Sequence, residues 1–194
     1  MRVLVVHAHP VETSFNRSLF HTVTETLATG GHQVDPLSLY DESFDALLSR
    51  EERINYEDVP GNLTPAIQPY VDRLLAAEAI VFVHPVWNYG YPAVLKGYFD
   101  RIFLPGVSFA LADGGLKPLL TNIRRAAFVT TYGGDRWRTF LMGDPPRRLA
   151  RRWGWATFQT KTPPKYLALY DMNNNRQPQL TAFLEKVKAE FRRW

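Results

Sequence analysis

Short apolar runs and amphipathic segments alternate along the chain. Strand-like segments occupy residues 2–8, 34–39, 79–83, 126–131 and 155–159, and those at 2–8 and 79–83 contain apolar runs without polar alternation. Such runs are typical of strands that are buried on both faces of a parallel sheet. A predicted helix follows each of these segments: apolar residues recur at helical spacing at 15–27, 67–75, 94–102 and 180–191, and residues 145–153 suit a short basic helix. Each predicted strand is therefore followed by a predicted helix.

This alternation predicts a three-layer, doubly wound α/β sandwich with helices on both faces of a five-stranded parallel sheet. Right-handed crossovers leave few topologies and favour the strand order 2-1-3-4-5. The 194 residues fit a single domain, 1–194, with two irregular segments at 41–62 and 105–122. Segment 41–62 is acidic and poorly periodic, so we expect it to lie outside the core.

Composition excludes several classes of protein. The chain has no cysteine, which excludes a disulfide scaffold, a thiol nucleophile and cysteine-ligated metal centres, and no metal site is expected. No apolar run approaches the ~20 residues of a membrane span, so no integral membrane segment is expected. The apolar start at residues 1–6 is too short for a signal peptide, which favours a cytoplasmic location.

Candidate chemistry lies where strands end, because open parallel sheets bind ligands beyond their carboxyl edge. The loop after the first strand, residues 9–18, has hydroxyls and an imidazole at a helix start, without a GxGxxG or P-loop motif. Free N–H groups there make an anion site. The alternative is a plain helix cap at Ser14.

Two further loops end at the same edge. Residues 85–90 carry aromatic side chains that suit the wall of a pocket for a flat ring, and Asn88 offers an amide to its polar edge. Packing against a neighbouring subunit is the alternative for these aromatics. Gly133 and Gly134 follow the fourth strand and would present N–H groups to a developing anion, or form a simple turn.

Together these loops resemble the NAD(P)H:quinone oxidoreductase family of flavodoxin-like flavoproteins. The similar segments are His9-Pro10-x-x-Thr13-Ser14-Phe15-Asn16, the run from Pro85 to Arg101, and Thr131-Tyr132-Gly133-Gly134. The similarity extends from residue 1 to about Gly134 and fades afterwards.

The resemblance implies a flavin cofactor, FAD or alternatively FMN, with NAD(P)H as electron donor. It assigns the flavin phosphate and ribityl chain to His9, Thr13, Ser14, Phe15, Asn16 and Ser18. It assigns the ring to Pro85, Val86, Trp87, Asn88 and Tyr89, and the ring's pyrimidine edge to Thr131, Tyr132, Gly133 and Gly134. The implied reaction is ping-pong: hydride passes from NAD(P)H to the flavin, and then to a quinone or similar flat electrophile.

The resemblance also implies a homodimer. It leaves the acid–base group open, because the family's tyrosine and histidine after the Gly-Gly loop have no match here; Tyr132 is the candidate substitute. Two other functions remain as alternatives, a non-catalytic flavin electron carrier and a regulatory subunit of a membrane transport protein.

The charge of the chain is asymmetric. Residues 1–116 hold 7 Lys and Arg against 14 Asp and Glu, whereas residues 117–194 hold 16 against 5. A basic half could serve nucleic acid, an anionic surface or a phosphorylated ligand, but no recognisable motif supports a nucleic-acid partner. The cluster Arg147, Arg148, Arg151 and Arg152 is either a solvated helix face or a site for the phosphates of FAD or NADPH.

Overall fold

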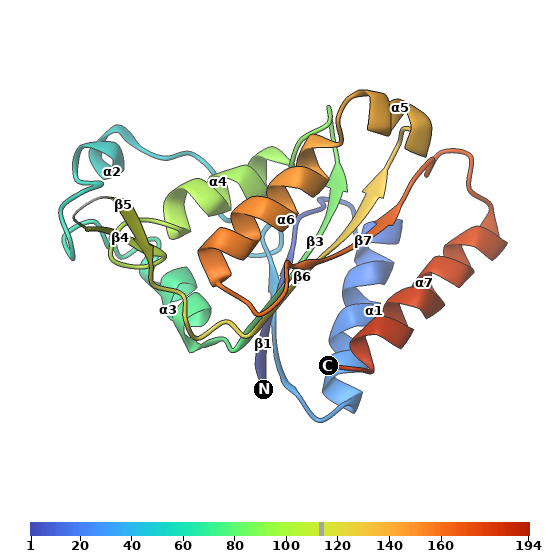
Figure 1. Cartoon of the computed structure of the whole chain (residues 1–194), viewed down its shortest axis with the longest axis horizontal. Helices are drawn as coiled ribbons and strands as arrows, with labels where there is room; N and C mark the ends of the chain where they lie inside the picture. The colour runs from blue at the N-terminus through green and yellow to red at the C-terminus, as the bar shows by residue number, and fades with distance from the viewer. Residues whose placement is uncertain (113–114) are drawn as a thin grey trace.

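The computed structural model describes residues 1–112 and 115–194, and a five-stranded parallel sheet forms its centre (Figure 1). The strands are β1 (Arg2–His7), β2 (Gln33–Ser38), β3 (Ala79–Val86), β6 (Arg125–Tyr132) and β7 (Lys165–Leu169). Their order in the sheet is β2-β1-β3-β6-β7, and every neighbouring pair is parallel. Counted along the chain, this is the predicted order 2-1-3-4-5, which is confirmed.

Helices cover both faces of the sheet, as predicted. Figure 1 shows α1 (Phe15–Thr29) and α7 (Gln177–Phe191) on one face. The other face carries α3 (Gln68–Ala76), α4 (Ala93–Ile102) and α6 (Pro145–Phe158). Alternate side chains of β1 point to opposite layers: Val3 and Val5 pack with α1 and α7, whereas Leu4 and Val6 pack with the other group. Burial on both faces explains why the strand is apolar throughout.

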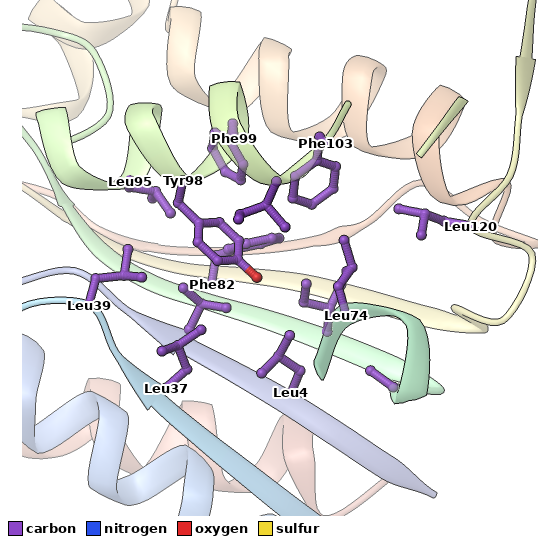
Figure 2. Packing of buried hydrophobic residues seen from close by; sticks show 14 of the residues in the cluster. Leu4, Leu37, Leu39, Leu74, Phe82, Leu95, Tyr98, Phe99, Phe103 and Leu120 are labelled. Carbon is purple, nitrogen blue, oxygen red and sulfur yellow. The ribbon is translucent and has the colours of Figure 1, made fainter. Parts of the chain in front are cut away.

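The larger of the two hydrophobic clusters lies between the sheet and α4 (Figure 2). Leu95, Tyr98, Phe99 and Phe103 reach from the α4 side toward Phe82 on the central strand β3. Phe82 and Phe99 meet edge-to-face with ring centroids 5.2 Å apart. This aromatic layer holds α4 against β3 and so positions the loop that joins them.

The prediction of the last strand, at residues 155–159, is wrong. Residues 155–158 form the final turn of α6, Gln159 caps it, and the fifth strand is β7, further along the chain. Ala150, Gly154 and Phe158 recur every four residues and are all buried, which makes one continuous helical face. Gly154 contributes by being small, because a Cβ there would lie 3.0 Å from Pro164 Cγ. The helix ends instead at Gln159, whose φ is 48°.

The two irregular segments contain structure of their own. Segment 41–62 holds the short helix α2 (Arg50–Ile54), and segment 105–122 holds an antiparallel hairpin, β4 (Phe109–Ala112) with β5 (Gly115–Pro118). Residues 113 and 114 of that segment lie outside the described part. The expectation that segment 41–62 lies outside the core is wrong, since Phe44 is buried in the larger cluster and Glu52 is 8% exposed. Within the described residues, no helix is both long enough and apolar enough to cross a membrane.

Segment 41–62 approaches α4 closely at Gly97. A Cβ added at Gly97 would lie 2.1 Å from the carbonyl oxygen and 2.6 Å from Cα of Ala46. Gly97→Ala is therefore expected to lower the free energy of unfolding by about 2 kcal/mol, because backbone atoms must move to admit the methyl group. Urea denaturation measures the loss.

The control for this prediction is Lys96→Ala, on the exposed side of the same helix. It removes only the surface ion pair with Asp100, with Nζ and Oδ1 2.5 Å apart, and should change stability by less than about 0.5 kcal/mol. Equal stability of Gly97→Ala and the wild type would contradict the close contact.

Candidate functional site

The three loops singled out in the sequence meet at the carboxyl edge of the sheet. The rings of His9 and Trp87 lie 5.8 Å apart, which joins the loops after β1 and β3. Asn16 Nδ2 donates a hydrogen bond of 2.7 Å to Thr131 Oγ1, which joins the start of α1 to the end of β6. Both Asn16 and Thr131 are buried, so this contact is part of the interior of the site.

A cleft of about 380 Å³ opens between the loops after β3 and β6. It is lined by Val86, Trp87, Asn88, Tyr89, Tyr132, Gly133 and Gly134. A tight turn forms one wall: Asn88 and Tyr89 have φ of 49° and 56°, and the N–H and C=O groups of Trp87 and Gly90 bond reciprocally. Pro85 lies one step behind the cleft, buried in β3 and paired in register with Thr131.

Both loops that line this cleft carry backbone donors without a partner within residues 1–112 and 115–194. Among the described residues, no acceptor pairs with the N–H of Asn88, Tyr89, Gly133 or Gly134. The absence of side chains at the two glycines keeps these groups accessible: a Cβ at Gly134 would lie 3.8 Å from the Tyr89 hydroxyl and narrow the cleft. An aromatic wall with free N–H donors opposite suits a flat ring with a polar edge.

The start of α1 offers an anion site beside the cleft. Ser14 caps the helix by accepting a 3.1 Å hydrogen bond from Arg17 N, which leaves the N–H groups of Phe15 and Asn16 without a partner in the described chain. No acidic side chain lies in the first turn. Thr13 and Ser18 are exposed at this helix end. These donors and the helix dipole fit a phosphate group.

Two residues in this region have more specific roles than the sequence indicated. The ring of Phe15 packs on Phe183, with centroids 6.5 Å apart, so only its backbone N–H serves the anion site. His9 Nδ1 accepts a 3.1 Å hydrogen bond from Val11 N, which leaves Nε2 to carry the hydrogen and donate. Burial lowers the pKa of His9, and the neutral ring is the form that can accept at Nδ1. His9 is therefore a neutral hydrogen-bond donor.

Tyr132 belongs to a buried hydrogen-bond network behind the cleft. Its hydroxyl donates to Asp144 Oδ1 at 2.7 Å and lies 2.5 Å from the Tyr166 hydroxyl, which must then donate to it. The Tyr170 hydroxyl donates to Asp144 Oδ2 at 3.2 Å, and its ring stacks on Tyr132 with centroids 4.6 Å apart. Burial, reinforced by Tyr166 and Asp144, raises the pKa of Tyr132, so its hydroxyl keeps its proton.

Sequence reasoning missed Asp144, Tyr166 and Tyr170. Asp144 and Tyr166 bond Tyr132 directly but lie 12 and 34 residues from it in the sequence. Tyr170 bonds Asp144 and lies 26 residues from it. No local spacing in the sequence therefore connects these residues. One local signal existed, an aspartate before two prolines at a helix start. Asp144 adopts the left-handed conformation, with φ of 45° and ψ of 60°, which is unusual for a residue with a side chain.

Fold and site together define a doubly wound α/β protein with N–H groups at a helix start, unpaired within the described residues, beside an aromatic cleft. The chain belongs to the family described as having a flavodoxin-like fold, which matches residues 1–189. This confirms the predicted fold class.

Individual relatives agree with this assignment. An uncharacterized NAD(P)H oxidoreductase of Haemophilus influenzae is 32% identical over 142 residues, 72% of this chain and 69% of the relative. An FMN-dependent NADH:quinone oxidoreductase of Coprothermobacter proteolyticus is 30% identical and aligns over 69% of each chain. The crystal structure of Smu.1420 from Streptococcus mutans superposes over 100% of both chains with a TM-score of 0.86 at 26% identity. The predicted resemblance and the oxidoreductase class are confirmed.

Proposed function

We propose that the protein is a flavin-dependent NAD(P)H oxidoreductase that reduces quinones or similar flat electrophiles by two-electron, ping-pong hydride transfer. The observation that carries the proposal is the cleft of about 380 Å³ with aromatic walls and unpaired N–H donors. It lies next to an anion site at the start of α1, as the ring and phosphate of one flavin require. The relatives named as NAD(P)H and NADH oxidoreductases support the donor and the reaction class.

The residues divide into two groups around a flavin. His9, Thr13, Ser14, Phe15, Asn16 and Ser18 would hold the phosphate and ribityl chain, Phe15 through its N–H group. Val86, Trp87, Asn88 and Tyr89 would line the ring, with Pro85 supporting them from β3. Thr131, Tyr132, Gly133 and Gly134 would reach the pyrimidine edge, where Thr131 acts through its bond to Asn16.

A bound flavin would supply the hydride chemistry, accepting from NAD(P)H and delivering to the acceptor. The N–H groups of Gly133 and Gly134 would stabilise negative charge at the polar edge of a flat ring held in the cleft. Trp87 and Tyr89 exclude water from one side and orient a flat acceptor against the ring. The Tyr132 hydroxyl, protonated and buried, is the candidate proton donor.

The sequence analysis expects FAD, with FMN as the alternative. We propose FMN, because the relative from Coprothermobacter proteolyticus that is named FMN-dependent aligns over 69% of each chain. A cytoplasmic location and a homodimer belong to the same proposal. Exposed apolar side chains on α5 (Arg136–Leu141) and just after it support the dimer, since a second copy could cover them; they are Trp137, Phe140, Leu141 and Met142.

The first test is a visible absorption spectrum of the purified protein, titrated with FMN and FAD in parallel. We expect a bound-flavin band that bleaches on adding NADPH and returns on adding the quinone menadione. Chromatography of the flavin released by heat identifies FMN or FAD.

Two outcomes would contradict the proposal. If neither flavin binds at micromolar concentration, the cleft has another ligand. If flavin binds but no donor bleaches it, the protein is an electron carrier rather than an enzyme.

A further inference from the structure

A second hollow, of about 490 Å³, lies between α5, α6 and the segments on either side of β7. Five of the side chains that line it are arginines: Arg136, Arg147, Arg148, Arg151 and Arg152. In the part of the chain that the structure describes, none of the five forms an ion pair with a carboxylate. The hollow therefore concentrates positive charge that the protein does not neutralise.

The arrangement of these arginines is unfavourable without an anion. Arg147 and Arg151 are four residues apart on α6, as are Arg148 and Arg152, so like charges face each other along the helix. The carboxylate that lines the hollow, Asp144, accepts hydrogen bonds from Tyr132 and Tyr170 at 2.7 and 3.2 Å. Several guanidinium groups converging in this way suit a ligand with more than one negative charge, such as a phosphate monoester.

Aromatic side chains in the wall of the hollow suit a ligand that also has a ring. Trp155 lines the hollow and is 49% exposed, and its Nε1 donates a 2.8 Å hydrogen bond to Thr160 O that fixes the indole plane. Tyr170 is held by its stacking on Tyr132. Fixed aromatic faces beside arginines match a heteroaromatic base that carries phosphates. The volume is within the range of small-molecule sites, about 300–1,000 Å³.

The hollow and the flavin cleft share a wall. Tyr132 lines the cleft, Tyr170 and Asp144 line the hollow, and the three are in direct contact. A ligand with a reactive ring at one end and a phosphorylated adenosine at the other can therefore reach both. A reduced pyridine dinucleotide has this form.

We infer that the basic hollow binds the adenosine 2′-phosphate of NADPH, so that the enzyme prefers NADPH to NADH. The inference rests on the proposed function, which makes a reduced pyridine dinucleotide the electron donor. A phosphate monoester adds a charge of about −1.5 to −2 near neutral pH. The diphosphate that NADH and NADPH share carries too little negative charge to balance five arginines that form no ion pair in the described structure. The 2′-phosphate of NADPH supplies additional negative charge.

Calorimetric titration of the protein at fixed ionic strength, first without flavin and then after loading with flavin, tests the inference. The probes are adenosine 2′,5′-bisphosphate, its 3′,5′ isomer of equal charge, and ADP. We expect the 2′,5′ compound to bind about tenfold more tightly than either of the others. Equal affinities would show a non-selective basic surface, and tightest binding of ADP would assign the hollow to the adenosine diphosphate of FAD; either result overturns the inference.

A double variant locates the binding. Arg147→Ala/Arg151→Ala should weaken the 2′,5′ compound about tenfold and raise the KM for NADPH with little change in the KM for NADH. The control is Arg192→Ala, which removes an exposed arginine just beyond α7 and should leave both values unchanged. Unchanged affinity in the double variant would overturn the inference. Flavin titration of each variant is a separate measurement: if flavin does not bind even the wild type, the proposed function fails, while the phosphate selectivity is still decided by calorimetry.

Discussion

Tyr132→Phe is expected to lower kcat for quinone reduction about 100-fold while flavin affinity stays within about twofold. The substitution keeps the ring that lines the cleft and removes the hydroxyl that Tyr166 and Asp144 contact. Because burial raises the pKa of this hydroxyl, it keeps its proton at neutral pH and is a hydrogen-bond donor. Steady-state kinetics at saturating NADPH, together with a flavin titration, measures the two quantities.

Tyr166→Phe is the matched control, since it removes the same hydrogen bond from the other side. It leaves the Tyr132 hydroxyl in place with its 2.7 Å bond to Asp144. If Tyr132 is the proton donor, kcat should fall much less in this variant than in Tyr132→Phe. Equal losses in the two variants would mean that the network only positions the wall of the cleft.

Arg101→Met should lower the free energy of unfolding by about 3 kcal/mol. Arg101 is 5% exposed and its Nη2 lies 2.5 Å from Glu52 Oε1. A methionine of similar length would leave the Glu52 carboxylate buried without its partner. Urea denaturation measures the loss of unfolding free energy. If the ion pair contributed nothing, the variant and the wild type would have the same denaturation midpoint.

The same ion pair gives stability a pH dependence with a definite sign. Burial opposes ionisation of Glu52, but the hydrogen bonds from Arg101 and Ser49 outweigh it, so the pKa lies below the ordinary value of 4.5. Its contribution is therefore complete above about pH 4.5 and is lost as the pH falls through the lowered pKa. The double variant Arg101→Met/Glu52→Gln keeps the helix cap at Ser49 and should recover much of the stability, with less acid sensitivity.

The fold was predictable because its signals are local. Unbroken apolar runs indicated buried parallel strands, and the carboxyl-edge rule then brought His9, Trp87 and Thr131 into one site although they are far apart in the chain. The last strand was misplaced because the apolar residues from 155 onward predict a strand of their own. In the structure Gly154 is a small residue against Pro164, and the helix continues through it.

The network behind the cleft and the basic hollow could not be predicted in the same way. Asp144 acquires its role from tyrosines that β6 and β7 bring together, and this depends on strand pairing rather than on spacing. The arginines of α6 were visible as a cluster, but two interpretations remained open. Only the positions of Trp155 and Tyr170 show that the cluster borders a hollow rather than a flat solvated face.

The assembly of the cleft from loops at residues 9–18, 85–90 and 131–134 has a consequence for the lifetime of the protein. These loops meet only in the folded chain, so a flavin bound there binds the native state and not the unfolded one. By mass action, free flavin at 100 times its Kd would add about 2.7 kcal/mol to stability. Cofactor supply would then set how much of the protein escapes degradation, and a cell short of riboflavin would lose the enzyme itself as well as its activity.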